Sequence, residues 1–386
     1  MRFLNRGSGP NLSSCQPTAI KIVTRSASSF HRLMLTVMFV VPALLLSACA
    51  SSSGSVEASS DDREFVYVTN QGDASVNVID VSTNTVSEVV DLKEFGFDAG
   101  AKPHHIAVEP DGAHWYVSLI SAGRVLKFTR DNELVGQAEF LVPGLLELDP
   151  SSNLLYVGRS MAAVNPPQRI GQVDTNTMEV EELEVFIPRP HALAVAPNGR
   201  FVYSASLAEN RVTVIDMETG DTQFHDLEGP THTLVDLQIA PDGKTMVAGG
   251  QLTAQFFFFD AEDQAGIPIQ KTMEVDAAPW HPVFNREGTR AYFANKMADK
   301  VTVLNMETRE VEAVIEGNGL AQPHGTALSS DGRYLYVSNQ NMNMAYSAAD
   351  GSNPGTVVVI DTESAEIVKV IEVGTLPSGA GGRPTW

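Results

Sequence analysis

A pattern of three short strands recurs seven times between Glu64 and the C-terminus, and it limits the fold more than any other feature of the sequence. Each copy contains an apolar strand, a turn such as Pro110-Asp111-Gly112, a second strand, and a third strand of β-branched residues that ends near Asp. The second strands read FVYVTN at 65, HWYVSL at 114, LLYVGR at 154, FVYSAS at 201, TMVAGG at 245, RAYFAN at 290 and YLYVSN at 334. A copy of roughly 40 to 50 residues accommodates four short strands joined by hairpins. Because one such sheet cannot bury both of its faces alone, the copies are expected to stack around an axis as an all-β, seven-bladed propeller.

The two ends of the repeat are incomplete in complementary ways. The first strands are expected to begin near Pro103, Pro143, Pro190, Pro230, Pro279, Pro323 and Pro377. No second strand follows Pro377, whereas FVYVTN at 65 has no first strand before it. The N- and C-terminal segments are therefore predicted to complete one blade together, so that residues 64–386 form one closed propeller.

The N-terminus has the order of features that is typical of an exported protein. Arg25 and Arg32 precede an apolar run over 33–46, which is shorter than a membrane span. The run ends in Leu46-Ser47-Ala48-Cys49, which resembles a bacterial lipobox. The resemblance implies a lipoprotein signal peptide over 1–48 and a lipid on the Cys49 thiol. A signal peptide with ordinary cleavage and an incidental Cys is the alternative.

Residues 49–63 lack apolar periodicity and are predicted to be a flexible tether. Ala50, directly after Cys49, resembles the sorting preference for the outer membrane. We therefore expect an exported bacterial lipoprotein on the periplasmic side of the outer membrane or at the cell surface. Its contact with the membrane would be through the lipid anchor only.

The charge of the chain limits its partners. The chain carries 47 acidic and 26 basic side chains, and residues 1–48 hold five of the basic ones and none of the acidic ones. A mature protein that starts at Cys49 has 21 basic and 47 acidic side chains, a formal charge of −26. This field repels polyphosphates, which argues against nucleic acid, and it suits metal cations or basic proteins such as an envelope protein partner. With Cys15 removed and Cys49 bound to lipid, metal chemistry must proceed without cysteine.

The chain contains Tyr67-Val68-Thr69-Asn70, followed by SVNVIDVSTNTV, and recurring PDG turns and YV-x-N strands. These features resemble the YVTN family of seven-bladed β-propellers. The resemblance covers nearly the whole mature chain and implies the fold. It leaves the activity open, because relatives include surface-layer proteins, lactonase-like proteins, haem-binding propellers and copper enzymes. The chain has no G-x-S-x-G elbow, phosphate loop, Rossmann fingerprint, C-x-x-C or H-E-x-x-H motif that would choose among them.

Six histidines lie at the expected starts of first strands: His104, His105, His191, His232, His281 and His324. Three of them follow a Pro and lie eight residues before the Gly of the next turn, two lie one residue later, and His232 lies three residues earlier. Since first strands surround the channel of a propeller, these side chains are expected to converge at one of its mouths. Converging imidazoles without cysteine form a site for copper or zinc, whereas isolated ones would only bond neighbouring carbonyls.

The adjacent pair His104-His105, with single histidines from other blades at the same level, resembles the histidine ring of the nitrous oxide reductase propeller, which holds a multicopper-sulfide cluster. The resemblance implies copper as the preferred metal, with zinc as the other candidate. Gly144 and Ser378 depart from the ring, and no cupredoxin domain follows the last blade. A mononuclear or dinuclear site is therefore expected rather than a complete reductase.

The loops after the second strands are expected to open at the same mouth. They hold candidate substrate-binding or metal-supporting residues, namely Arg159, Lys296, Asn339, Gln340, Met297 and Met342, with Met161 and Met344 nearby. Thioethers favour Cu(I), although Met more often fills gaps in a core. Arg159 and Lys296 suit an anionic substrate or a haem propionate, or else are solvated rim charges.

Three classes of function remain. The first is a lipid-anchored, metal-binding propeller in metal handling or redox chemistry. The second is a non-catalytic propeller that binds another protein or a polysaccharide. The third is a lactonase-like hydrolase or a haem-handling propeller. Glu147, Asp149 and Asp236 lie in first strands, but no spaced pair among them indicates acid/base catalysis, so the sequence does not decide whether the protein is an enzyme.

Overall fold

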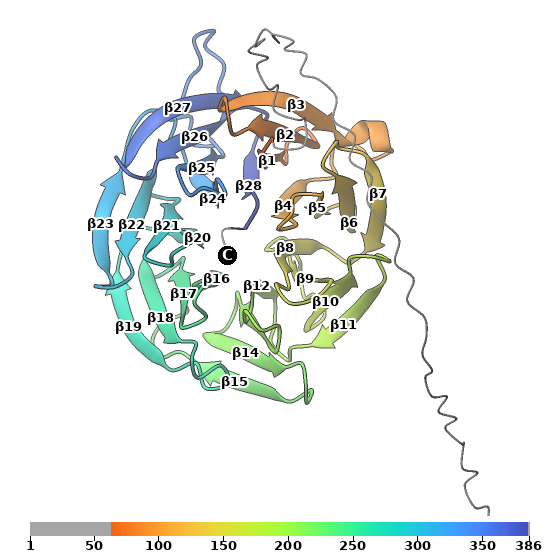
Figure 1. Ribbon diagram of the computed structural model, residues 1–386, viewed down its shortest axis with the longest axis vertical. Coiled ribbons are helices and arrows are strands. Elements are labelled where there is room, and N and C mark those ends of the chain that lie inside the picture. Colours follow the sequence, from red (N-terminus) through yellow and green to blue (C-terminus); the bar gives the residue numbers. More distant parts are fainter. Residues whose placement is uncertain (1–62, 385–386) are drawn as a thin grey trace, which may run out of the picture. The chain divides into compact units, whose positions relative to one another are not determined.

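The computed structural model describes residues 63–384. In this range twenty-eight strands form seven four-stranded antiparallel sheets, and the 3-10 helix η1 (Leu92–Phe95) is the one helical element (Figure 1). The predicted all-β, seven-bladed propeller is confirmed. The expected signal peptide over 1–48, the lipidated Cys49 and the tether before Arg63 lie outside the described residues.

Each blade runs from an inner first strand to an outer fourth strand. The inner strands are β4 (Pro103–Val108), β8 (Pro143–Leu148), β12 (Pro190–Val195), β16 (Leu234–Ile239), β20 (Pro279–Phe284), β24 (Pro323–Leu328) and β28 (Pro377–Gly381). The second strands are β1 (Phe65–Asn70), β5 (His114–Leu119), β9 (Leu154–Arg159), β13 (Phe201–Ser206), β17 (Thr245–Gly250), β21 (Arg290–Asn295) and β25 (Tyr334–Asn339). The third strands are β2 (Ser75–Asp80), β6 (Arg124–Thr129), β10 (Arg169–Asp174), β14 (Arg211–Asp216), β18 (Gln255–Asp260), β22 (Lys300–Asn305) and β26 (Gly355–Asp361). The outer strands are β3 (Thr85–Asp91), β7 (Leu134–Glu139), β11 (Val180–Glu184), β15 (Thr222–Asp226), β19 (Ile269–Glu274), β23 (Glu310–Ile315) and β27 (Glu366–Val373).

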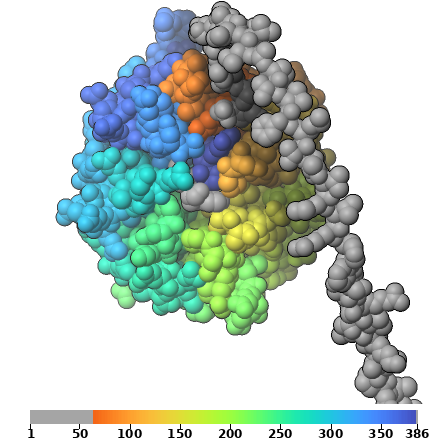
Figure 2. Space-filling view, viewed as in Figure 1, coloured from red at the N-terminus to blue at the C-terminus, as the bar shows by residue number. Residues whose placement is uncertain are grey.

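One blade is completed by strands from both ends of the described chain. β28 pairs antiparallel with β1, which places Tyr67 opposite Gly381 and Asn70 opposite Pro377. A Cβ at Gly379 would overlap the carbonyl oxygen of His104, so Gly allows β28 to approach β4 closely. β28, in dark blue, lies beside β1 and β4 near the axis (Figures 1 and 2). The predicted closure is therefore confirmed.

Aromatic side chains fill the space between neighbouring blades. Tyr67 stacks on Trp115 of the next blade at a centroid distance of 4.7 Å, and Trp115 stacks on Phe128 at 4.4 Å. Phe256 stacks on Phe293 of the following blade at 4.4 Å. Burial of such rings contributes about 25 cal/mol per Å² of apolar area, so blade packing is the main source of stability. Within residues 63–384, no helix is long and apolar enough to span a membrane.

The strand directions give the propeller two different ends. The inner strands begin at the end that carries the loops from second to third strands and from outer strands to the next inner strand, such as 120–123 and 140–142. We call this end the histidine face. The opposite end carries the turns from inner to second strands and from third to outer strands, such as 109–113 and 130–133. We call it the turn face.

Candidate functional site

Five histidines meet at the axis, on the histidine face. The ring centroid of His104 lies 6.5 Å from that of His105, 6.3 Å from that of His191 and 5.9 Å from that of His324. The ring of His281 lies 5.9 Å from His105 and 5.1 Å from His324. His105 is half-buried and the other four are buried. Four blades thus supply one contiguous group of rings, which we call the imidazole cluster.

A residue in the left-handed backbone conformation directly before each inner strand sets this register. Lys102 precedes β4 with a φ of 56°, and Gln322 precedes β24 with a φ of 54°. The next residue is the strand-initial Pro, and the histidines follow it by one or two positions. In the blade of β16 the left-handed residue is Thr233, with a φ of 56°. That strand therefore begins at Leu234, and the predicted start near Pro230 is wrong.

His232 consequently lies outside the cluster. The position in its blade that corresponds to His104 is occupied by Val235. The His232 ring packs against Phe257, with the centroids 4.8 Å apart. Its Nδ1 bonds to Thr253 Oγ1 and its Nε2 to the carbonyl oxygen of Glu228, both at 2.9 Å. The protein itself uses both ring nitrogens, so His232 is not available as a ligand in this arrangement.

Small residues occupy the corresponding position in the two blades that separate the rings. Gly144 in β8 lies between β4 and β12, and Ser378 in β28 lies between β24 and β4. His104 contacts His191 past the first of these blades and His324 past the second. Gly144 and Ser378, which stand where a full ring would have histidine, therefore leave the remaining imidazoles in contact with one another.

The ring nitrogens of the cluster differ in their hydrogen bonds. His191 Nδ1–H donates to the carbonyl oxygen of Arg159 at 2.6 Å, and Gln71 Nε2 donates to His104 Nδ1 at 2.9 Å. The backbone N–H of Leu146 donates to His105 Nδ1 at 3.2 Å. His104 Nε2 and His324 Nδ1 are buried and have no hydrogen-bond partner within residues 63–384. Buried polar atoms are normally paired, so these two nitrogens are available to bind a further group.

Burial lowers the pKa of every imidazole in the cluster. The pKa falls from 6.5 to about 3 for His105 and His281 and to about 4 for His191. The pKa values of His104 and His324 are also lowered well below 6.5, mainly by burial and further by neighbouring positive charge. All five rings are therefore neutral at pH 7. A neutral imidazole has a free lone pair, which is the form that binds a metal.

A lysine and a tryptophan border the cluster. Lys296 Nζ lies 4.0 Å from the ring centroid of Trp280, and the Trp280 ring lies 4.5 Å from that of His324. Burial lowers the pKa of Lys296 from 10.5 to about 8. The predicted candidate Lys296 is therefore a partly desolvated cation at the edge of the site rather than a solvated rim charge.

A cavity of about 160 Å³ lies below the cluster in the channel. His105, His281, Asp236 and Glu147 are among its lining residues. His281 Nδ1 bonds to Asp236 Oδ2 at 3.0 Å, and the N–H of Leu237 donates to Asp236 Oδ1 at 2.9 Å. Burial raises the pKa of Glu147 to about 8, with a smaller contribution from Asp236.

The pair of Asp236 and His281 was not predicted, although Asp236 follows its strand-initial residue by two positions, as His105 and His281 do. That shared position is the signal that could have found it. Asp149, the other carboxylate noted in the inner strands, accepts hydrogen bonds from Ser151 and Ser152 in the adjoining turn. The expectation that no spaced pair among these carboxylates indicates acid/base catalysis stays a prediction, and the structure adds that Asp236 has an imidazole partner.

The spacing of the cluster can be tested against a shared metal ion. Two imidazoles bound to one ion at about 2 Å hold their ring centroids roughly 4.5 to 5.5 Å apart at bond angles of 90 to 120°, and about 6.3 Å apart when they lie opposite each other. The 5.1 Å between His281 and His324 lies in the first range, whereas the distances of 5.9 to 6.5 Å between the other neighbouring rings are longer. As the side chains stand, however, residues 63–384 contain no group of three or more His, Cys, Asp or Glu positioned to hold a metal ion. Ring rotation about χ1 and χ2 is required before the nitrogens converge.

The remaining predicted residues have different surroundings. Arg159 is fully buried; its Nη1 donates to the Leu141 carbonyl at 2.7 Å and its Nη2 to Glu182 Oε1 at 2.6 Å. Asn339 is buried and donates to the Val337 carbonyl at 2.8 Å, while Gln340 is half-buried. These contacts give Arg159 and Asn339 structural roles. Met297 and Met342 are 67% and 61% exposed on the histidine face.

Comparison with protein families gives one match. The family model described as "Lactonase, 7-bladed beta-propeller" matches residues 143–368 of this chain. That segment covers more than half of the sequence and runs from the start of β8 into β27. The match agrees with the blade count seen in the structure.

One curated relative is similar to the chain. It is the uncharacterized protein YwhL of Bacillus subtilis (strain 168), which is 25% identical over 340 residues. The aligned region covers 83% of this chain and 65% of the relative. The chain thus spans about two thirds of the length of the curated relative that it matches.

Two solved structures illustrate how broadly the fold is used. A streptogramin B lyase is 13% identical with a TM-score of 0.59, over 84% of this chain and 94% of the lyase. The dihydro-haem d1 dehydrogenase NirN, in complex with its ligand, is 15% identical with a TM-score of 0.58, over 82% of this chain and 74% of NirN. At these identities the likeness shows the fold alone.

Proposed function

Given that the chain belongs to the family of seven-bladed β-propeller lactonases, whose fold does not by itself determine activity, we propose that it is a metal-binding propeller of the cell envelope. The imidazole cluster would bind copper by preference, with zinc as the second candidate. The protein would act in metal handling or redox chemistry. This role agrees with the strongly negative formal charge, which attracts cations and basic proteins rather than nucleic acid.

The observation that supports the proposal is the pair of unpartnered ring nitrogens inside a cluster of neutral imidazoles. His104 Nε2 and His324 Nδ1 are buried without a partner in the described part of the chain. Leaving such atoms unpaired costs roughly 1 to 3 kcal/mol each, a cost that a bound ligand removes. Imidazoles without cysteine suit copper and zinc, and copper(II) binds such donors more tightly than zinc does.

The residues of the cluster and its surroundings would have different roles in metal binding. His104, His191 and His324 would supply ligand nitrogens after ring rotation, and His281 would be oriented by Asp236 through their 3.0 Å hydrogen bond. Trp280 would exclude water from one side of the cluster. Copper, when bound, would supply one-electron redox chemistry.

Calorimetric titration of the purified protein with Cu(II), Cu(I) and Zn(II) tests the proposal. Wild type should bind stoichiometrically, and His104→Ala combined with His324→Ala should lower the affinity by at least about 100-fold. Because burial lowers the pKa to about 4 for His191 and well below 6.5 for His104 and His324, binding should persist from pH 7 to about pH 5. Val235→Ala, in the corresponding position of a blade without a ring, is the matched control. Equal affinity of wild type and double variant would contradict the proposal, and a Soret band would favour haem handling instead.

The second candidate is a lactonase-like hydrolase, which the family match favours. Asp236 could position the neutral His281 in the cavity, with the neutral Glu147 as a proton donor. Asp236→Asn should then abolish hydrolysis of lactones by the metal-free protein. A protein that hydrolyses no lactone in a broad panel would exclude this candidate.

The proposed location is the periplasmic side of the outer membrane or the cell surface, with Cys49 carrying the lipid. Cys49→Ala should release the protein from membranes or stop its processing. Metabolic labelling with palmitate, followed by membrane fractionation, measures both effects. Continued labelling of the Cys49→Ala protein would contradict the lipid anchor.

A further inference from the structure

Three methionines on the histidine face are exposed to an unusual degree. Met297, Met342 and Met344 are 67%, 61% and 67% exposed. The six other methionines within residues 63–384 are buried or half-buried. Packing therefore does not explain why methionine stands at these three positions.

Two loops from neighbouring blades carry the three side chains. Met297 lies in the loop between β21 and β22, and Met342 and Met344 lie in the loop between β25 and β26. Asn343 Nδ2 donates to Asp299 Oδ2 at 2.9 Å, which joins the two loops.

The joined loops are tied to the imidazole cluster. Asp299 Oδ1 accepts a hydrogen bond from the N–H of Gln322 at 2.6 Å, and Gln322 lies two residues before His324. On the other side, Lys296 precedes Met297 and holds its ammonium group over Trp280, which contacts His324. The methionine loops therefore border the His324 side of the cluster.

We propose that Met297, Met342 and Met344 form an entry site for Cu(I) at the mouth of the channel, from which the ion passes to the imidazole cluster. The transfer to the cluster rests on the proposed function, whereas capture of the ion by the thioethers does not. Thioether sulfur is a soft donor that selects Cu(I) over Zn(II) and over hard cations. Capture forms dative S–Cu bonds without a change of oxidation state. The Asp299 carboxylate between the loops contributes negative charge next to the site.

Another role for the same surface is the docking of a protein. Eight exposed large apolar residues lie on loops of the histidine face: Leu141, Val164, Phe186, Leu252, Met297, Met342, Met344 and Leu376. Substitution of Met by Leu separates the two roles, because Leu keeps the apolar surface and removes the sulfur. Methionine stands at all three exposed large apolar positions of the two joined loops, which favours the metal.

Titration of the purified protein with Ag(I), a redox-inert substitute for Cu(I), tests the inference. With ¹³C-methyl-labelled methionine, the signals of Met297, Met342 and Met344 should shift at the first equivalents. The triple variant Met297→Leu, Met342→Leu and Met344→Leu should bind Ag(I) at least about 30-fold more weakly in competition with a chelator. The matched control carries Met217→Leu, Met273→Leu and Met306→Leu, three half-buried methionines, and should bind like wild type.

The outcomes separate this inference from the proposed function. In the His104→Ala and His324→Ala background, the three methyl signals should still respond to Ag(I). A response there, with no metal bound by the histidines of wild type, would support capture and contradict the proposed function. Unchanged Ag(I) affinity of the triple Leu variant would overturn the inference and leave protein docking as the role of this face.

Discussion

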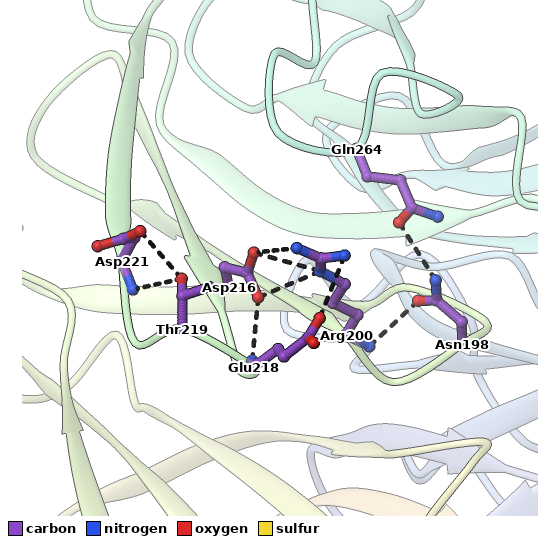
Figure 3. A network of polar contacts seen from close by, with 7 residues as sticks. All are labelled: Asn198, Arg200, Asp216, Glu218, Thr219, Asp221 and Gln264. Carbon is purple, nitrogen blue, oxygen red and sulfur yellow. Dashed lines mark hydrogen bonds and ion pairs between the residues drawn. The ribbon is translucent and has the colours of Figure 1, made fainter.

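On the turn face, carboxylates and amides are bonded to the turn backbone and to one another, whereas on the histidine face the buried ring nitrogens His104 Nε2, His324 Nδ1 and Trp280 Nε1 have no partner within residues 63–384. Figure 3 shows the first arrangement: Arg200 is paired with Asp216, and Asp216 accepts a hydrogen bond from the N–H of Glu218. Asn198 joins this group to Gln264 of the next blade. The polar groups of the turn face are thus paired, whereas ring nitrogens of the histidine face are left without partners. Departures from such pairing are expected at functional sites, so function is expected at the histidine face.

Apolar exposure follows the same division. Of the exposed large apolar residues in the described part of the chain, those outside the histidine-face loops lie on outer strands, and none lies in a loop of the turn face. The turns of one end therefore serve the fold, while the loops of the other end offer soft donors and an apolar surface.

Both faces depend on the closing strand, so its removal should have the largest effect. Deletion of residues 375–386 removes β28, exposes the edge of β1 and uncovers the inner strands β4 and β24. The melting temperature should fall by about 10 °C or more, measured by calorimetry. Deletion of residues 384–386 keeps β28 and should change it by less than about 2 °C. A 375–386 deletion that melts like wild type would show that the ring does not need closure.

The second largest effect is expected at low pH, which should destabilise the folded protein through the buried histidines of the histidine face. In the folded protein burial lowers the pKa to about 3 to 4 for His105, His191 and His281 and well below 6.5 for His104 and His324, while the unfolded chain binds protons near pH 6.5. The unfolded state therefore binds more protons as the pH falls from 6.5 towards 4, and stability is lost over that window. His104→Ala combined with His324→Ala should flatten the decline in melting temperature over this range. If the melting temperatures of wild type and variant decline in parallel with pH, these rings are solvated.

The histidine positions illustrate what the repeat could predict. Strand-initial Pro and the turn Gly fix the register of β4, β12 and β24, so the convergence of His104, His191 and His324 followed from spacing. The displacement of His232 was present in the same spacing, because Val235 and not His232 lies eight residues before Gly243. Pro230 obscured it, since β16 begins at Leu234 after the left-handed Thr233.

Side-chain contacts between blades could not be predicted from the sequence either. Arg159 was expected at a rim but is fully buried against Phe140 and Glu182, a placement set by how β9 and β10 meet the preceding loop. The bond between Asp236 and His281 joins residues 45 positions apart on two blades. Spacing within one repeat defines positions along a strand, but side-chain pairing across blades depends on tertiary packing.

The contribution of the channel between the two faces to stability should change with pH in the opposite direction. Glu147 has a pKa raised from 4.5 to about 8 by burial, so the folded state holds its proton more tightly than the unfolded state. Stability is therefore lost as the pH rises from 4.5 to 8, by about 1.4 kcal/mol per pH unit at most. Glu147→Gln removes this loss and should raise the melting temperature at pH 8 but not at pH 5. A variant that is destabilised at both pH values would show that the carboxyl is ionised and paired at neutral pH.

The smallest effect is expected on the turn face, from Arg200→Ala. Its guanidinium bonds to Asp216 at 2.7 Å and lies 3.2 Å from Glu218, but the Arg200 side chain is 44% exposed. Water and salt screen such pairs, so the loss of stability should be small and should shrink further in 1 M salt. Urea unfolding at low and high salt measures both values. Because no metal ligand lies on this face, Cu(II) and Ag(I) affinities should stay within about twofold of wild type. A large change in metal affinity would mean that the two faces are coupled through the blade of β12 to β15, and the division between a structural end and a binding end would then have to be abandoned.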